Sequence, residues 1–277
     1  MNDIIQDYES RLRFSGKAIS TIKSYSNNLK SFLIYCQAKP TTDMVISYLD
    51  ELLKKNIEKS TWNQIMYSIR FYFWITNKEF PLFIKKQKVR QKSKNIPLKE
   101  DIAKAIINTE ELKEKAILLL FYDGWLRRSE AQILMTKDID FSKNLIYVRA
   151  GKGNKDRVVW IKENTKWLFY YYLKSRPNKN NPYFINKNGS DKRYMSKKYL
   201  YSVVNQHDAL WHPHLLRHAG ATYYYIETGD LIGTSRKLGH EDITTTMIYL
   251  SLKREDLVMH KPSPYPLLIN GRFAHNY

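Results

Sequence analysis

The sequence contains one cysteine, Cys36, among 277 residues. A lone cysteine cannot form a disulfide within the chain, and it cannot supply the ligands of a cysteine-built zinc site, so the sequence excludes both features. We expect Cys36 to be a small apolar residue of a helix. Apolar runs of eighteen or more residues, which a membrane-spanning helix needs, are also missing. The amino terminus lacks the pattern of a secretory signal, and we expect a soluble cytoplasmic protein with no membrane partner.

Acidic residues are scarce relative to basic ones. The chain has 27 Asp and Glu against 46 Lys and Arg, which gives a formal net charge of +19. Such an excess is typical of a protein that binds a polyanion, and nucleic acid is the partner that it favours. A basic protein without such a partner is the alternative. An anionic membrane surface is disfavoured, because the basic residues do not gather on one amphipathic face.

Residues 1–84 show the apolar periodicity of helices. Ile22 and Leu29 lie on one face of an early segment, and Trp62 and Ile69 lie on one face of the last. Glycine and proline residues separate the segments. The pattern predicts a bundle of about four helices that forms a first domain.

The composition changes in residues 85–97. This stretch contains six basic residues and no acidic one. We interpret it as a basic linker between two domains, whose side chains neutralise DNA phosphates. A solvated loop is the alternative for any one of them. The candidate DNA-contacting side chains of the linker are Lys85, Lys86, Lys88, Arg90, Lys92 and Lys94.

The rest of the chain reads as helices around one β-rich stretch. Residues 145–148 and 157–161 flank a turn cluster of glycine and asparagine, which predicts a β-hairpin. Its tip carries Lys152, Lys155 and Arg157, and we expect this tip to be presented outward, where it could enter a DNA groove. The glycines lack the spacing of a P-loop, so nucleotide binding is not indicated. The predicted fold class is mainly α with a small β-hairpin or sheet.

The segment WLRRSE places an arginine three residues before a glutamate. In a helix, Glu130 could hold Arg127 rigid by i,i+3 pairing while the guanidinium faces an anion. The adjacent Arg128 is the alternative arginine. An ordinary pair on a solvated helix face is the competing structural interpretation.

The segment HPHLLRHAGAT gathers polar side chains near a predicted helix start. His214, Arg217 and His218 lie at i, i+3 and i+4, which places them on one face where amide dipoles attract anions. Together with His212 they also suggest a metal site. We disfavour a metal, because Arg217 would lie beside the cation and no Asp, Glu or Cys is adjacent.

The segment GHEDITTTMIYL places Tyr249 nine residues after His240. With 21 tyrosines in the chain, packing is the commoner role for any one of them. The order of the candidate residues nevertheless resembles the tyrosine recombinases, the integrase family that includes phage integrases and Xer-type resolvases. The resemblance spans roughly residues 96–252. The residues that carry it are, in order, Arg127, Lys152, His214, Arg217, His240 and Tyr249.

The resemblance implies a two-domain DNA clamp. Residues 1–84 would be a SAM-like core-binding domain and residues 98–277 the catalytic domain, with a carboxyl-terminal tail from residue 253 onward. The implied partner is double-stranded DNA with a specific recombination site. The implied assembly is a homotetramer on paired sites, which allows for a monomer in free solution. No metal, cofactor or ATP is expected.

The resemblance also implies roles for the residues of the motifs. Tyr249 would form a 3′-phosphotyrosine intermediate, with His214 as base and Lys152 as the acid for the leaving hydroxyl. Arg127 and Arg217 would clamp the phosphate, and His240 would donate a hydrogen bond to it. The supporting residues would be Glu130 and His218.

One position departs from the family. Members often have glycine immediately before the Leu-Arg pair, whereas this chain has Trp125 there and Gly124 one residue earlier. We favour Arg127 over Arg128, because Glu130 then takes the family's acidic position.

Three other interpretations remain open. A topoisomerase of type IB would use the same chemistry without exchanging partners, and a DNA-binding relative would have lost catalysis. A histidine-based metal hydrolase would require a metal, so a chelator would inhibit it. The tail beyond Lys253 ends in an apolar stretch that either docks on a neighbouring subunit or caps its own domain.

Overall fold

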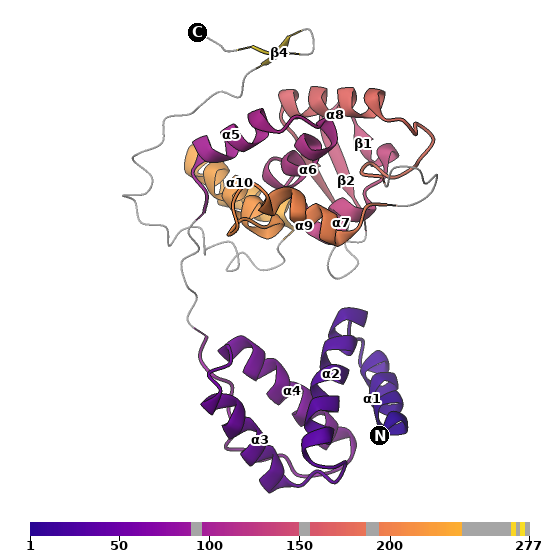
Figure 1. The fold of residues 1–277 in the computed structure, drawn as a ribbon, viewed down its shortest axis with the longest axis vertical. Coiled ribbons are helices and arrows are strands. Elements are labelled where there is room, and N and C mark those ends of the chain that lie inside the picture. The colour runs from indigo at the N-terminus through magenta and orange to yellow at the C-terminus, as the bar shows by residue number, and fades with distance from the viewer. Residues whose placement is uncertain (90–95, 150–155, 187–193, 240–266, 270–271, 275–277) are drawn as a thin grey trace. The chain divides into compact units, whose positions relative to one another are not determined.

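A computed structural model describes residues 1–89, 96–149, 156–186 and 194–239, and the backbone of residues 267–269 and 272–274. The chain divides into two compact units, Met1–Lys92 and Ser93–Tyr277. Each unit is described by itself (Figure 1). Within the described ranges, every helix is too short or too polar to cross a bilayer.

The first unit consists of four helices, as the periodicity predicts. They are α1 (Asn2–Phe14), α2 (Ile19–Tyr35), α3 (Thr42–Lys54) and α4 (Lys59–Ile75). Each helix buries one apolar stripe, and the stripes form a single core. Two buried polar groups fix how the helices meet. The Tyr8 hydroxyl donates to the Ser68 carbonyl at 2.8 Å, and Trp62 Nε1 donates to the Leu49 carbonyl at 3.0 Å.

The start of the expected linker is attached to this unit. The side-chain amide of Asn63 on α4 donates to the Gln87 carbonyl and accepts from its N–H, at 3.0 and 2.7 Å. The side chains of Lys85, Lys86 and Lys88 are exposed on either side of this anchor. Of the other linker candidates, Arg90, Lys92 and Lys94 lie outside the described residues.

The second unit is arranged around one central helix (Figure 1). Helix α6 (Leu112–Tyr122) is buried on all sides from Lys115 to its end, and it packs against α8 (Glu163–Ser175) and α10 (Pro213–Thr228). A helix that is apolar all round needs neighbours on every face, and this unit supplies them. Among the residues that the structure describes, its other helical elements are α5 (Lys99–Asn108), α7 (Arg128–Ile133), the 3-10 turn η1 (Thr136–Asp138), α9 (Lys197–Asn205) and α11 (Leu231–Leu238).

A three-stranded antiparallel sheet completes this unit. The predicted hairpin is present as β2 (Leu145–Val148) and β3 (Arg157–Trp160), and β1 (Ile139–Asp140) adds a short third strand. The register pairs Val148 with Arg157. The tail contains a further pair of strands, β4 (Leu267–Ile269) and β5 (Arg272–Ala274). The predicted fold class, mainly α with a small sheet, is confirmed; β1, β4 and β5 were not predicted.

Candidate active site

The centre of the site is the carboxylate of Glu130. This residue lies in the first turn of α7 and is 4% exposed. Its Oε2 accepts from the Arg127 backbone N–H at 2.6 Å, and its Oε1 accepts from Arg127 Nη1 at 2.8 Å. Arg127 is the residue that caps α7, so the predicted pairing is present but begins the helix instead of lying inside it. Arg128 is exposed, which leaves Arg127 as the arginine directed into the cluster.

The placement expected for Arg157 is wrong. Its guanidinium does not face outward with the hairpin tip: Nη1 and Nη2 donate to the two oxygens of Glu130, each at 2.8 Å, and only 9% of the side chain is exposed. The reason is the strand period of two, which places Arg157 on the same face as the buried Val159. A bidentate pair of this kind fixes both partners in orientation as well as in distance.

Arg217 enters the cluster from α10 and is 2% exposed. Its Nη1 donates to the Trp125 carbonyl at 2.5 Å, and its Nη2 donates to the Leu238 carbonyl at 2.6 Å. Nη1 also lies 3.7 Å from Glu130 Oε2. Two segments distant in sequence therefore hold one guanidinium between them.

The end of α11 receives all three arginines. Arg157 Nε donates to the Lys237 carbonyl at 3.0 Å, and Arg127 Nη2 lies 3.5 and 3.4 Å from the carbonyl oxygens of Leu238 and Gly239. Carbonyls at the end of a helix lack intrahelical partners and form the negative end of its dipole, so they suit guanidinium groups. The residue that follows in the chain is His240.

The guanidinium groups keep Glu130 ionised. Burial alone would raise its pKa, but the hydrogen bonds and charge of Arg157, together with the hydrogen bonds from Arg127, outweigh burial and lower the pKa from 4.5 to about 2. At neutral pH the cluster is therefore a carboxylate among three guanidinium groups. One negative charge does not neutralise three positive ones, and the net positive charge suits an anion such as a phosphate.

The histidines of α10 contact one another. His218 Nε2 and His214 Nε2 are 2.9 Å apart, and the two rings meet edge to face. His212 caps the helix, because its Nδ1 accepts from the Leu215 N–H at 3.1 Å. In the part of the chain that the structure describes, no three His, Cys, Asp or Glu side chains group as metal ligands.

The remaining members of the predicted site are Lys152, Lys155, His240 and Tyr249, all of which lie outside the described residues.

Trp125 occupies the position where the family often has glycine, and its backbone explains that preference. Its φ is +49°, in the left-handed region that glycine adopts without strain. Its side chain is nevertheless buried, at 2% exposure. The strained turn directs the Trp125 carbonyl to Arg217.

Gly220 lets α10 approach this turn closely. A Cβ at Gly220 would lie 1.9 Å from the Tyr122 carbonyl oxygen and 2.7 Å from Trp125 Nε1. We therefore expect Gly220→Ala to lower the free energy of unfolding of the second unit by about 2–3 kcal/mol, because the backbone must move. Urea unfolding measures the loss. The matched control is Gly229→Ala at the end of α10, where a Cβ meets open space and only the positive φ resists; about 1 kcal/mol is expected there. Equal losses in the two variants would contradict the close approach.

The sequence analysis did not predict two buried basic side chains of this region, Arg157 and Lys237. The inward role of Arg157 follows from the alternation with Val159 and was available in the sequence. Lys237, a buried lysine on α11, had no such signal, because the rings that contact it come from distant parts of the chain.

The chain is a mainly α-helical protein of two units with a cluster of three arginines around the buried Glu130 in the second unit, and solved structures share its fold. The crystal structure of XerA recombinase is 25% identical, with 95% of this chain and 99% of that chain covered and a TM-score of 0.52. XerH site-specific recombinase bound to a palindromic difH substrate is 20% identical, with 90% and 82% covered and a TM-score of 0.68.

Sequence comparison places the chain in a family. Residues 96–256 match the phage integrase family, and residues 4–93 match the phage integrase N-terminal SAM-like domain. Tyrosine recombinase XerA of Pyrococcus horikoshii is 30% identical over 262 residues, which are 92% of this chain and 91% of that protein. The chain belongs to the phage integrase family, and its resemblance to tyrosine recombinases is confirmed.

Proposed function

We propose that this protein is a site-specific DNA recombinase that cleaves and rejoins duplex DNA through a 3′-phosphotyrosine intermediate, without metal or ATP. The observation that carries the proposal is the convergence of Arg127 and Arg217 on the carbonyl of Leu238 at the end of α11, two residues before His240. Family membership supplies the class of reaction. The fixed positions of the two guanidinium groups support a phosphate-binding role for this cluster.

The two arginines act as an electrostatic clamp. Cleavage of a phosphodiester develops charge on the non-bridging oxygens, and fixed guanidinium groups stabilise that charge without reorganising during the reaction. Glu130 anchors Arg127, and Arg217 is held at both terminal nitrogens by backbone carbonyls. On approach of DNA, the partly exposed Arg127 is the more accessible of the two.

Tyr249 supplies the attacking oxygen. A free tyrosine phenol has a reference pKa of about 10, so the attacking group must transfer its proton to a base as it attacks phosphorus, and His214 is the proposed base. The P–O5′ bond breaks, and Lys152 donates a proton to the leaving 5′ oxygen. His240 donates a hydrogen bond to the phosphate. The proposed role of His218 is to orient His214, which it contacts.

The covalent intermediate conserves the energy of the broken bond. A phosphotyrosyl diester is close in free energy to the phosphodiester that it replaces, so a 5′ hydroxyl can attack it and restore DNA without ATP. Attack by a hydroxyl from a partner duplex exchanges strands. We propose a tetramer that brings two sites together, in which each protein chain clamps its DNA with residues 1–84 and 98–277. The exposed lysines at the start of the linker would contact phosphates.

A trapping experiment tests the proposal. Nicked duplex substrates release a short oligonucleotide on cleavage, so the covalent adduct accumulates and can be isolated in the presence of EDTA. We expect trypsin to yield the peptide from Leu238 to Lys253 carrying a nucleotide remnant after nuclease digestion. This peptide contains one tyrosine, Tyr249, so its mass and fragmentation identify the attachment site.

The outcome separates the proposed reaction from others. Cleavage that requires a divalent cation, or a remnant on a peptide without Tyr249, would contradict the mechanism. Religation to a second duplex that carries the same site distinguishes recombination from DNA relaxation, because a relaxing enzyme rejoins the original strand.

A further inference from the structure

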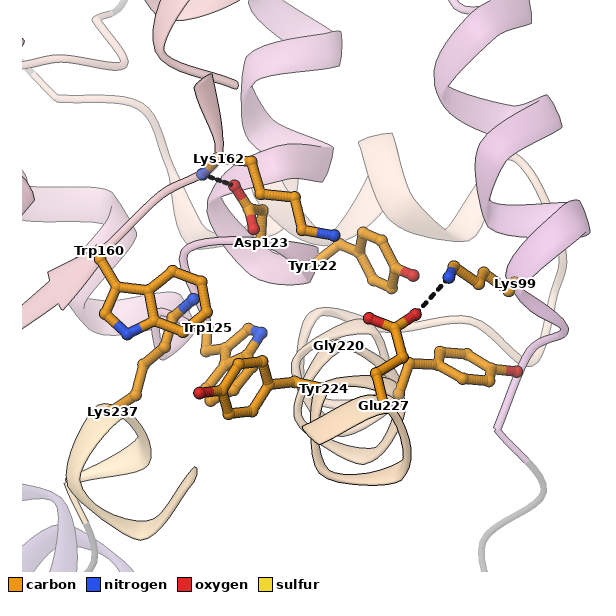
Figure 2. Close-up of a pocket in the computed structure, with 11 residues that line it drawn as sticks. Lys99, Tyr122, Asp123, Trp125, Trp160, Lys162, Gly220, Tyr224, Glu227 and Lys237 are labelled. Atoms are coloured by element: carbon orange, nitrogen blue, oxygen red, sulfur yellow. Dashed lines mark hydrogen bonds and ion pairs between the residues drawn. The ribbon is translucent and has the colours of Figure 1, made fainter. Parts of the chain in front are cut away.

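Lys237 lies in an apolar environment that is unusual for a lysine. The residue is 3% exposed, and its Nζ lies 3.5 Å from the centre of the Trp160 ring and 4.1 Å from that of Trp125 (Figure 2). Among the residues that the structure describes, none accepts a hydrogen bond from this nitrogen. A buried ammonium without an acceptor loses hydration and needs another source of stabilisation. The faces of two indole rings provide it as cation–π contacts. We call Lys237, Trp125 and Trp160 the indole cage.

Four charged residues face the same small cavity. Lys99 and Glu227 form an ion pair with each other, and the Asp123 carboxylate accepts from the backbone N–H of Lys162 at 2.8 Å (Figure 2). Burial lowers the pKa of Lys237 to about 7; Asp123 opposes this shift and Lys162 adds to it. The ammonium and amine forms are therefore both accessible near neutral pH.

Three tyrosines also line this cavity: Tyr122, Tyr223 and Tyr224. Tyr223 donates to the Pro97 carbonyl at 2.9 Å, and its pKa is raised to about 12, chiefly by burial. Burial also raises the pKa of Tyr224, whose ring contacts both indoles of the cage, edge to face with Trp125 and tilted against Trp160. Tyrosines with raised pKa values stay neutral near pH 7, so Lys237 is the group of the cage that changes charge there.

The indole cage is directly connected to Arg217, one of the two arginines of the proposed electrostatic clamp. Arg217 is held between the carbonyl of Trp125, a cage residue, and the carbonyl of Leu238, the neighbour of a cage residue. The contact between the Lys237 and Trp125 side chains therefore joins the two segments whose carbonyls grip the guanidinium. The Lys237 carbonyl in turn holds Arg157. Trp160 belongs to β3, the strand that begins at Arg157, so the cage is also joined to that strand.

We propose that Lys237 is a positioning residue: its ammonium, held between Trp125 and Trp160, fixes the separation of the two carbonyls that aim Arg217 at the scissile phosphate. This inference rests on the proposed recombinase function. It adds a residue that touches neither DNA nor the reacting atoms. A neutral side chain in its place would still pack against the rings, but it would lack the directional attraction that joins the two segments.

Lys237→Met separates positioning from folding. Methionine keeps an unbranched apolar chain and removes the charge, so the variant should remain folded with an unfolding midpoint at least as high as that of the wild type, because no buried charge is left unpaired. We expect single-turnover formation of the covalent adduct to fall about tenfold at pH 6, since a small misplacement of a catalytic group costs rate. The ratio of wild-type to variant rates should decline toward one by about pH 9, because wild-type Lys237 is then an amine.

Trp160→Leu provides the second variant and a double-mutant cycle. Trp160 is 37% exposed, so its replacement leaves the fold intact while removing one ring face. If the cage acts as a unit, the double variant with Lys237→Met should cleave no more slowly than Lys237→Met alone. The dissociation constant for uncleaved DNA, measured by fluorescence anisotropy, should stay within about twofold of wild type in all variants.

Three results would overturn the proposal. The first is an unchanged cleavage rate in Lys237→Met at every pH, and the second is multiplicative losses in the double variant. The third is a loss of DNA affinity that accounts for the whole loss of rate, which would make Lys237 a DNA contact. Wild-type protein in the same assay distinguishes these results from failure of the recombinase function. If the wild type forms no adduct, both proposals are wrong. If wild type and variant form the adduct equally fast, only the positioning role is wrong.

Discussion

Tyr249→Phe is expected to abolish the covalent protein–DNA adduct while leaving DNA binding intact. The substitution removes one oxygen, the proposed nucleophile, and keeps the ring. Loss of a nucleophile that no other group replaces lowers the rate by at least about 10³-fold, below detection in a trapping assay. Binding depends on phosphate contacts by basic residues, so its affinity and salt dependence should match those of the wild type.

A second tyrosine serves as the matched control. Tyr201 on α9 has an exposed ring, and Tyr201→Phe removes the same atom from the same unit. We expect its adduct yield to equal that of the wild type. An adduct that persists in Tyr249→Phe would assign the nucleophile to another residue. Loss of binding in the same variant would mean that the phenol contributes to recognition.

Much of the fold follows from local patterns. Each helix of the first unit has an apolar stripe of period 3.6. Such a stripe is stable when it is buried against the stripes of the neighbouring helices, which predicts the bundle. The hairpin strands also follow from their composition, because β-branched and aromatic side chains flank a turn. The short β1 strand was missed, since two residues carry no periodic signal.

The sequence also predicted some contacts of the site and missed others. The spacing of Arg127 and Glu130 predicts their contact, because residues three apart meet near a helix start. The inward direction of Arg157 required the phase of its strand, which Val159 fixes. The outward placement expected for the hairpin tip did not take that phase into account, and Arg157 pairs with Glu130 instead.

The indole cage could not be predicted from the sequence. Trp125, Trp160 and Lys237 come from a turn, a strand and a helix, and no spacing rule links them. Propensity even argues against the arrangement, because lysine is almost never fully buried without a partner. Contacts of this kind depend on how α10, α11 and the sheet meet, and Gly220 determines part of that approach.

Glu130→Gln is expected to destabilise the second unit by about 3 kcal/mol at pH 7 and to slow cleavage by about 100-fold or more. The pKa of Glu130 is lowered from 4.5 to about 2, a shift of about 2.5, and each unit corresponds to about 1.36 kcal/mol of stability contributed by the ionised carboxylate. Glutamine keeps the volume but directs amide hydrogens at guanidinium groups that stay buried. Arg127 would lose its anchor, and Arg217 would lose its nearest negative charge.

The pH dependence of the loss identifies its cause. Because the folded pKa is depressed, the contribution of Glu130 is complete above pH 5 and disappears as the pH falls toward 2, so wild type and Glu130→Gln should converge in urea unfolding measured between these values. Asp138→Asn is the matched control, since Asp138 is equally buried but pairs with Arg149, whose side chain is 63% exposed and can be rehydrated. We expect this control to lose about 1 kcal/mol and to cleave DNA at the wild-type rate. A stability difference for Glu130→Gln that stays constant with pH would show that packing, and not the charge shared with the arginines, holds the cluster together.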